Sequence, residues 1–229
     1  MTGLRRLLWP GVMALAMLAV LLSLGSWQVR RLHWKEELLT RIARAEAGPS
    51  VPLPAEPEPF SKVLVTGHLR DDLAASYGAE VRDTPAGTQL GTQLIEPLER
   101  AEGEAILVDR GWVPDKRLRP IEQPEGEVTL EGYVRPSDSP RLFSASDNPS
   151  GRQFYTLDAA AIGAAIGLRQ VAPFFLVVMG TPPPELYPDP ARHLPRPPNN
   201  HLSYAISWYG MAIALVVIFV LWARKVLKQ

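Results

Sequence analysis

The chain has 229 residues, with 24 basic and 24 acidic side chains and no cysteine. This length accommodates one or two domains, and the absence of cysteine excludes disulfides, thiolate metal sites and a cysteine nucleophile. The zero net charge hides a separation along the chain, because every acidic side chain lies between Glu36 and Asp189. The two tails carry only basic side chains, namely Arg5, Arg6, Arg224, Lys225 and Lys228.

Two uncharged apolar runs lie near the two ends of the chain, at residues 7–24 and 204–222. At about 1.5 Å per residue, a helix of either length is just long enough to cross a hydrocarbon core of about 30 Å. We therefore expect transmembrane helices at 7–27 and 201–222, embedded in a lipid bilayer. The alternative for the first run is a cleavable signal peptide with a small-x-small site at Ser23 to Gly25. The helical pattern that continues past this site argues against cleavage.

The distribution of charge predicts the orientation of the chain. The positive-inside rule places both basic tails in the cytoplasm, and a long middle domain is translocated whatever its charge. Nothing resembles a mitochondrial transit peptide, so we expect a multi-pass protein of a bacterial inner membrane with its middle domain in the periplasm. Arg30, Arg31 and Lys35 follow the first apolar run on the translocated side, where basic side chains need a separate reason.

The middle of the chain predicts a helix followed by a β domain. A juxtamembrane helix at 28–48 should end at Gly48 and Pro49. Runs rich in β-branched and aromatic residues then predict strands at 62–69, 92–98, 104–113, 127–136 and 173–180. One helix, capped by Asp158, interrupts them, and a Pro-rich connector covers 182–200. The expected fold class is an α+β membrane protein: two terminal transmembrane helices flank a small, mostly antiparallel β periplasmic domain with a helix, at 60–181.

The sequence contains no Gly-rich phosphate loop, no HExxH and no G-x-S-x-G. We therefore expect no enzyme, and nothing indicates a nucleic-acid partner. The stretch "LVDRGWVP" (107–114) has two interpretations. It is a strand-to-turn corner in which Gly111 permits an unusual backbone, Trp112 packs and Pro114 ends the pairing. Alternatively, Arg110 or Trp112 lies at a surface that binds a partner.

The two apolar helices carry matching polar and aromatic sets at the expected outer interface. One face of the second helix presents His201, Tyr204, Ala205 and Trp208, and one face of the first presents Trp27, Arg30, Arg31 and Trp34. One interpretation is an interfacial belt of aromatic and basic side chains, with Asn200 capping the second helix. The other is a haem pocket, in which His201 ligates iron, Arg30 and Arg31 bind the propionates, and the aromatic rings pack on the macrocycle.

Three stretches, "LGSWQVRRLHWK" (24–35), "VDRGWVP" (108–114) and "NNHLSYAISWYG" (199–210), resemble the signature stretches of the Surfeit locus protein one family, the cytochrome c oxidase assembly factors. The resemblance implies a protein that is not an enzyme and that helps to mature the catalytic subunit of a haem-copper oxidase. It also implies that the protein binds haem a transiently and helps to insert it, with a histidine matching His201 as the proposed ligand. Haem a synthase is a further candidate partner, and the client is either a cytochrome or a quinol oxidase. The rival hypothesis is a haem-free membrane scaffold that stabilises an oxidase subunit through Trp112 and the membrane helices.

Overall fold

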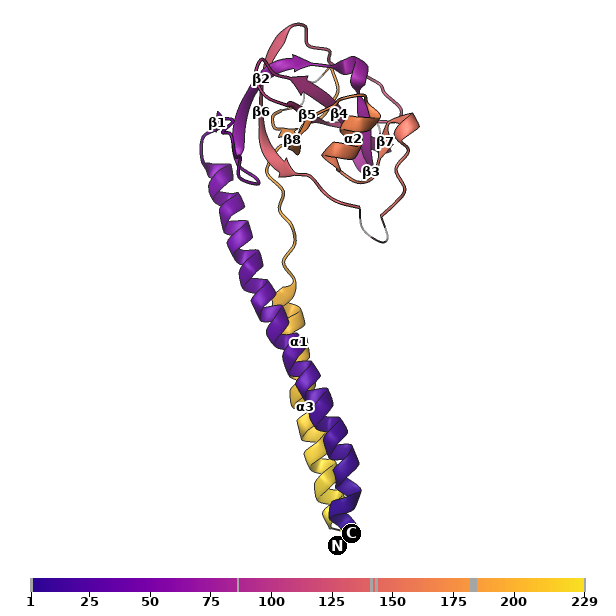
Figure 1. The fold of residues 1–229 in the computed structure, drawn as a ribbon. Coiled ribbons are helices and arrows are strands. Elements are labelled where there is room, and N and C mark those ends of the chain that lie inside the picture. Colours follow the sequence, from indigo (N-terminus) through magenta and orange to yellow (C-terminus); the bar gives the residue numbers. More distant parts are fainter. Residues whose placement is uncertain (1, 86, 141, 143, 182–184, 229) are drawn as a thin grey trace. The chain divides into compact units, whose positions relative to one another are not determined.

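The computed structural model describes residues 2–228, apart from 86, 141, 143 and 182–184. The chain divides into two compact units, which are described separately. The first contains residues 1–41 and 196–229, and the second contains residues 42–195. The first is a pair of helices and the second is a β domain with one helix on its surface (Figure 1).

Two long helices make up the first unit. The first, α1 (Thr2–Ala47), is continuous from the first apolar run to the end of the expected juxtamembrane segment, and the boundary between the units falls inside it. It ends where expected, because Gly48 N–H donates to the carbonyl of Arg44 at 3.0 Å and Pro49 follows. The second helix is α3 (His201–Leu227). Both α1 and α3 are long and apolar enough to cross a membrane.

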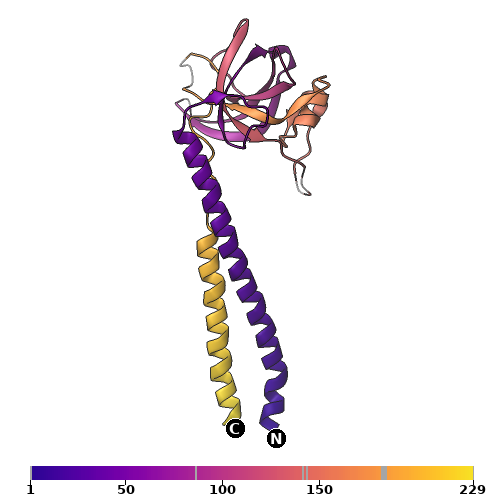
Figure 2. The same ribbon diagram turned by 60° about the vertical axis from the view of Figure 1, so that its left-hand side comes forward.

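The two helices pair in antiparallel fashion through small residues. The amino end of α1 and the carboxyl end of α3 lie at the same end of the pair (Figure 2). Gly25, Ala205 and Ala212 are buried, and a Cβ at Gly25 would lie 2.8 Å from the ring of Tyr209. Small residues allow two helix backbones to approach closely, which is how apolar helices associate where water supplies no driving force.

The second unit is built on a closed barrel of five strands. They are β2 (Lys62–Leu69), β4 (Gly87–Glu99), β5 (Ala105–Pro114), β6 (Glu127–Pro136) and β8 (Val171–Val178). Their order is β2-β6-β8-β5-β4, and β4 pairs back with β2 through Leu98 and Glu99, which closes the barrel. Every pair in the ring is antiparallel except β5 with β8. The expected predominance of antiparallel pairing is confirmed.

Three more strands extend this sheet: the ten-residue β3 (Ala75–Thr84) and the short strands β1 (Val51–Pro52) and β7 (Gln153–Phe154). Two 3-10 turns, η1 (Asp71–Leu73) and η2 (Pro149–Gly151), lie between the strands. The strands expected at 62–69 and 127–136 have these bounds, whereas β4 starts at residue 87 instead of 92 and β8 covers 171–178 instead of 173–180. Part of the expected Pro-rich connector pairs with the β domain, because Tyr187, Asp189 and Ala191 form bridges to it. Its first residues, 182–184, lie outside the described part.

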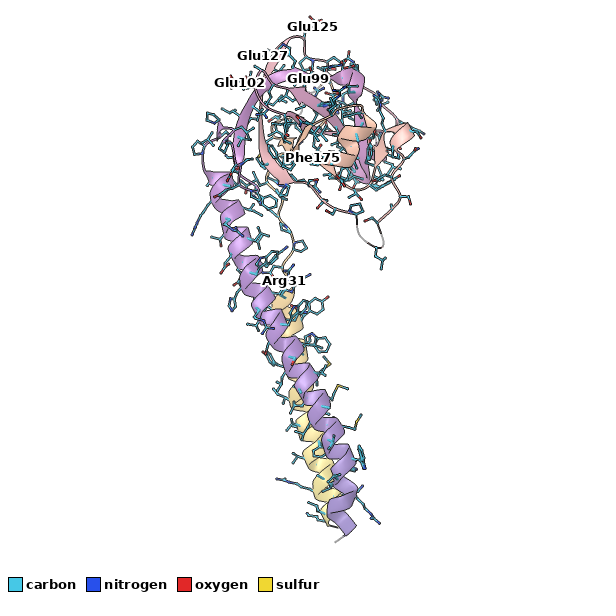
Figure 3. All side chains as sticks on the ribbon, in the orientation of Figure 1. Arg31, Glu99, Glu102, Glu125, Glu127 and Phe175 are labelled. Carbon is cyan, nitrogen blue, oxygen red and sulfur yellow. The ribbon has the colours of Figure 1, made fainter. Side chains whose placement is uncertain are left out.

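Two apolar clusters lie on opposite faces of the barrel wall. All five barrel strands contribute to one of them, which therefore fills the interior: Val63, Val65, Leu98, Ile106, Val108, Val134, Ala172 and Leu176. The other includes Leu107 and Phe175 and packs under α2 (Ala159–Ala165), on the outer face (Figure 3). The expected cap is confirmed, because Asp158 accepts a hydrogen bond from the N–H of Ala161 at 3.1 Å. Strand β5 is thus covered on both faces, and residues 106–114 are all buried.

Candidate functional site

His201 is the first residue of α3, and its imidazole is bonded to α1. Its Nδ1 lies 2.7 Å from Oε1 of Gln28, and Gln28 is only 8% exposed. An amide oxygen can only accept a hydrogen bond, so Nδ1 carries the proton and donates it. Within the described residues Nε2 has no hydrogen-bond partner. The imidazole is therefore held in the tautomer whose free lone pair is on Nε2.

Gln28 is a functional candidate that sequence reasoning missed. It lies on the buried stripe of α1, three residues after Gly25 and seven after Leu21, which places all three on one helical face. A buried amide without a partner is costly, and here the partner is the imidazole of His201 on the other helix. The available signal was a single polar residue within an otherwise small or apolar stripe.

The expected cap of α3 is wrong in its detail. The side chain of Asn200 makes no capping hydrogen bond, although its carbonyl accepts the N–H of Tyr204 at 3.3 Å. The side-chain oxygen of Asn199 instead lies 3.5 Å from the backbone N–H of His201, which is a long contact. His201 is consequently positioned by Gln28 more than by its own helix terminus.

The other expected site residues lie on the same two helices. The guanidinium of Arg31 stacks on the ring of Trp34 at 3.9 Å, and Arg31 lies at the level at which α3 begins (Figure 3). The remaining residues are Trp27, Arg30 and Tyr204, which are exposed, and Trp208, which is half-buried. In the described part of the chain, none of these four is hydrogen-bonded to His201. The structure therefore brings together two pairs, His201 with Gln28 and Arg31 with Trp34.

The third motif lies inside the β domain. Arg110 is 5% exposed and donates to Oε2 of Glu96 at 3.0 Å and to the carbonyl of Glu122 at 2.9 Å. Asp109 lies on the opposite face of β5 and accepts a hydrogen bond from the N–H of Gly111 at 3.1 Å. Asp109 and Arg110 therefore do not pair with each other. Burial raises the pKa of the Asp109 carboxyl to about 6 and also raises the pKa of Glu96, against the opposing charge of Arg110.

The interpretation of this motif as a packing feature is confirmed, but Gly111 and Trp112 lie inside β5, which stays paired with β4 through Pro114, and not at a turn. Gly111 has a φ of +126°, and a Cβ there would collide with the carbonyl of Asp189. The ring of Trp112 is fully buried, and its Nε1–H donates to the carbonyl of Glu80 at 3.1 Å. Neither Arg110 nor Trp112 lies on the surface, so the structure does not support the partner surface expected at these two residues. They pack the domain instead.

A match to a protein-family model identifies the family of this chain. The model of the SURF1 family matches residues 15–213, a range that contains all three motifs. The chain belongs to the SURF1 family. Members are known in general as oxidase assembly factors, and the family is not a catalytic one.

Individual relatives of this SURF1-family chain are similar over most of its length. The SURF1-like protein of Rickettsia conorii is 29% identical over 214 residues, which cover 90% of this chain and 88% of the relative. The SURF1-like protein of Rickettsia bellii is 30% identical over 215 residues, with the same coverage. The human Surfeit locus protein 1 is 31% identical over 230 residues, which cover 90% of this chain and 74% of the relative.

Proposed function

We propose that this protein binds haem a where the amino end of α3 meets the middle of α1, and that it helps to insert the haem into the catalytic subunit of a haem-copper oxidase. The observation that carries the proposal is the hydrogen bond from His201 to Gln28. Iron is ligated by a neutral imidazole nitrogen, and a group that accepts a hydrogen bond from the other nitrogen fixes the ring and makes it a better electron-pair donor to the iron. The residues present therefore fit a haem whose iron is bound by Nε2 of His201.

Basic and aromatic side chains next to this imidazole support the same ligand. Arg31 follows Gln28 by three residues and is its neighbour along the helix surface. Guanidinium groups bind carboxylates such as haem propionates through two parallel hydrogen bonds, and Arg30 and Arg31 are both exposed for that purpose. Trp27, Trp34, Tyr204 and Trp208 supply apolar surface for the macrocycle. This role also explains basic side chains on the translocated side.

A carrier must release what it binds. Only one histidine, His201, lies on α3, and a single protein ligand holds iron less firmly than the paired ligands of a resident cytochrome. The catalytic subunit of the oxidase receives the haem in this scheme, and haem a synthase is the partner that supplies it. We place the protein in a bacterial inner membrane with both termini in the cytoplasm and the β domain in the periplasm, since the basic tails lie at one end of the helix pair.

The test is a visible absorption spectrum of the full-length protein, produced with haem a synthesis active and purified in mild detergent. We expect a Soret band that His201→Ala abolishes and that the matched control His33→Ala retains, because His33 is exposed and lies 3.5 Å from Glu36 on its own helix.

The role of Gln28 is tested in the same way. Gln28→Leu should weaken haem binding by about 10–100-fold, which is the usual effect of removing the group that hydrogen-bonds a metal-ligating histidine, and Gln28→Glu should restore the binding. Equal spectra for the wild type and His201→Ala would refute ligation by His201. A wild type without haem would leave the scaffold function in its place.

A further inference from the structure

A cavity of about 360 Å³ lies in the β domain, at the low end of the range for small-molecule sites. It opens between β3, β5 and β6, beside the segment 189–191. Its wall combines aromatic and charged side chains, including Tyr77, Glu80, Arg82, Asp109, Tyr133 and Arg135. None of these residues belongs to the helix pair, so the cavity is independent of the haem site proposed above.

Almost every charged group of this wall already has a counter-ion. The ion pairs are Arg82 with Glu80 at 2.7 Å, Arg119 with Asp189 at 3.1 Å, and Arg135 with Asp138 at 3.5 Å. The exception is Asp109. Among the described residues, no Lys or Arg nitrogen lies within 4 Å of its carboxylate, and its one hydrogen bond comes from the N–H of Gly111. Among the described residues of this wall, Asp109 is thus the carboxylate that makes no direct ion pair.

This carboxylate is also removed from water, because Asp109 is only 4% exposed. A buried charge is costly unless it is paired, so a cation that enters the cavity and contacts Asp109 supplies the ion pair that the more distant Arg135 and Arg82 do not make. A metal ion is a poor candidate, since the described residues contain no group of three or more metal-ligating side chains. A guanidinium is large for a wall that already holds two of them, Arg82 and Arg135.

We infer that this cavity binds a primary ammonium group, with Asp109 as its counter-ion. An ammonium is a compact charge with three donors on a flexible stem, and the rings of Tyr77 and Tyr133 provide apolar and π surface for that stem. Tyr133 is itself buried, and its pKa is raised to about 12, so its hydroxyl stays protonated and neutral. The same chemistry is offered by a free alkylamine and by the lysine side chain of a partner polypeptide.

The ionisation of Asp109 gives the inference a distinctive pH dependence. Several groups act on this carboxyl: burial and Glu80 raise its pKa, while Arg135, Arg82 and the Gly111 N–H lower it, and the result is about 6. A pKa of about 6 leaves roughly one tenth of the carboxyl ionised at pH 5 and nearly all of it at pH 7.5. An alkylammonium ion stays protonated at both pH values, so the affinity of the cavity for it should rise about tenfold from pH 5 to pH 7.5.

Isothermal titration calorimetry of the full-length protein in detergent micelles tests this directly, with n-butylammonium chloride as the probe against potassium chloride at equal ionic strength. We expect saturable binding at pH 7.5, about tenfold weaker binding at pH 5, and loss of binding in Asp109→Asn. The matched control is Asp115→Asn, an exposed aspartate just after the same strand, which should bind as the wild type does.

A second probe distinguishes the source of the ammonium group. Binding of Nα-acetyl-lysine methylamide as well as n-butylammonium supports a lysine side chain of a partner, and binding of n-butylammonium alone supports a free amine. No saturable binding by the wild type, equal binding at the two pH values, or an equal response to potassium chloride would overturn the inference. The wild-type pH comparison decides the matter even if Asp109→Asn does not fold.

Discussion

Replacing Asp109 by asparagine should stabilise the protein at neutral pH and reduce the dependence of its stability on pH. The pKa of this carboxyl rises from 3.8 to about 6 on folding, because burial disfavours the charged form. The folded state therefore binds the proton more tightly than the unfolded state does. The stability that the folded state gains from protonation of the Asp109 carboxyl is fully present below about pH 4 and is lost as the pH rises through about 6.

The size of the effect follows from the same values. A pKa that rises by about two corresponds to a loss of at most about 3 kcal/mol of folding free energy between pH 4 and pH 7. Asparagine has nearly the same shape, keeps an oxygen to accept the N–H of Gly111, and carries no charge at either pH. At about 2–4 °C per kcal/mol for a chain of this size, Asp109→Asn should raise Tm at pH 7.5 by at most about 6–12 °C.

Thermal unfolding of the full-length protein in detergent, followed by near-ultraviolet circular dichroism, measures this. Wild type, Asp109→Asn and Asp115→Asn are compared at pH 4.5 and 7.5 in buffers free of primary amines, since such amines are the probe ligand above. The Asp115 variant accounts for the loss of one surface charge. If the difference in Tm between wild type and Asp109→Asn is the same at the two pH values, the carboxyl is not a destabilising buried charge and the reasoning fails.

Two further substitutions test the packing of each unit. Arg110→Met leaves Glu96 buried without its partner and should cost about 3–5 kcal/mol of folding free energy. Adding Glu96→Leu to Arg110→Met should recover most of this loss. Thermal unfolding of the single and double variants checks the prediction, and equal losses of stability in the two would contradict it. Gly25→Ala places a Cβ 2.8 Å from the ring of Tyr209 and should lower Tm, and Tyr209→Leu in the same chain should relieve the clash, which a double-variant cycle measures.

Local patterns predicted the elements whose signals are local. The strands at 62–69 and 127–136 are rich in β-branched and aromatic residues. The unusual backbone at Gly111 was predictable because a glycine between Arg110 and Trp112 has few reasons other than backbone geometry. Strand β3 was missed because Gly78, Glu80 and Asp83 interrupt its apolar residues and much of it is exposed. Backbone hydrogen bonds to β4 hold β3 in the sheet, although its own side chains bury little apolar surface.

Long-range partners could not be predicted from spacing. Closure of the barrel depends on two residues at the end of β4 meeting the end of β2, and nothing in either segment specifies that meeting. The counter-ion of Arg110 is Glu96 on the neighbouring strand, 14 residues away, and not the adjacent Asp109. Gln28 and His201 are 173 residues apart, so the helical pattern that placed His201 on one face of its helix did not indicate its partner on the other helix.

The two proposed sites use no residue in common, and this makes their functions separable. Gln28 and His201 belong to the helix pair, whereas Asp109 belongs to the β domain, and each is held by contacts within its own unit. Asp109→Asn should therefore leave the Soret band of the haem-loaded protein unchanged while it abolishes binding of n-butylammonium. Gln28→Leu should do the reverse. If either substitution alters both properties, the units are coupled, and the helix pair and the β domain act as one site instead of two.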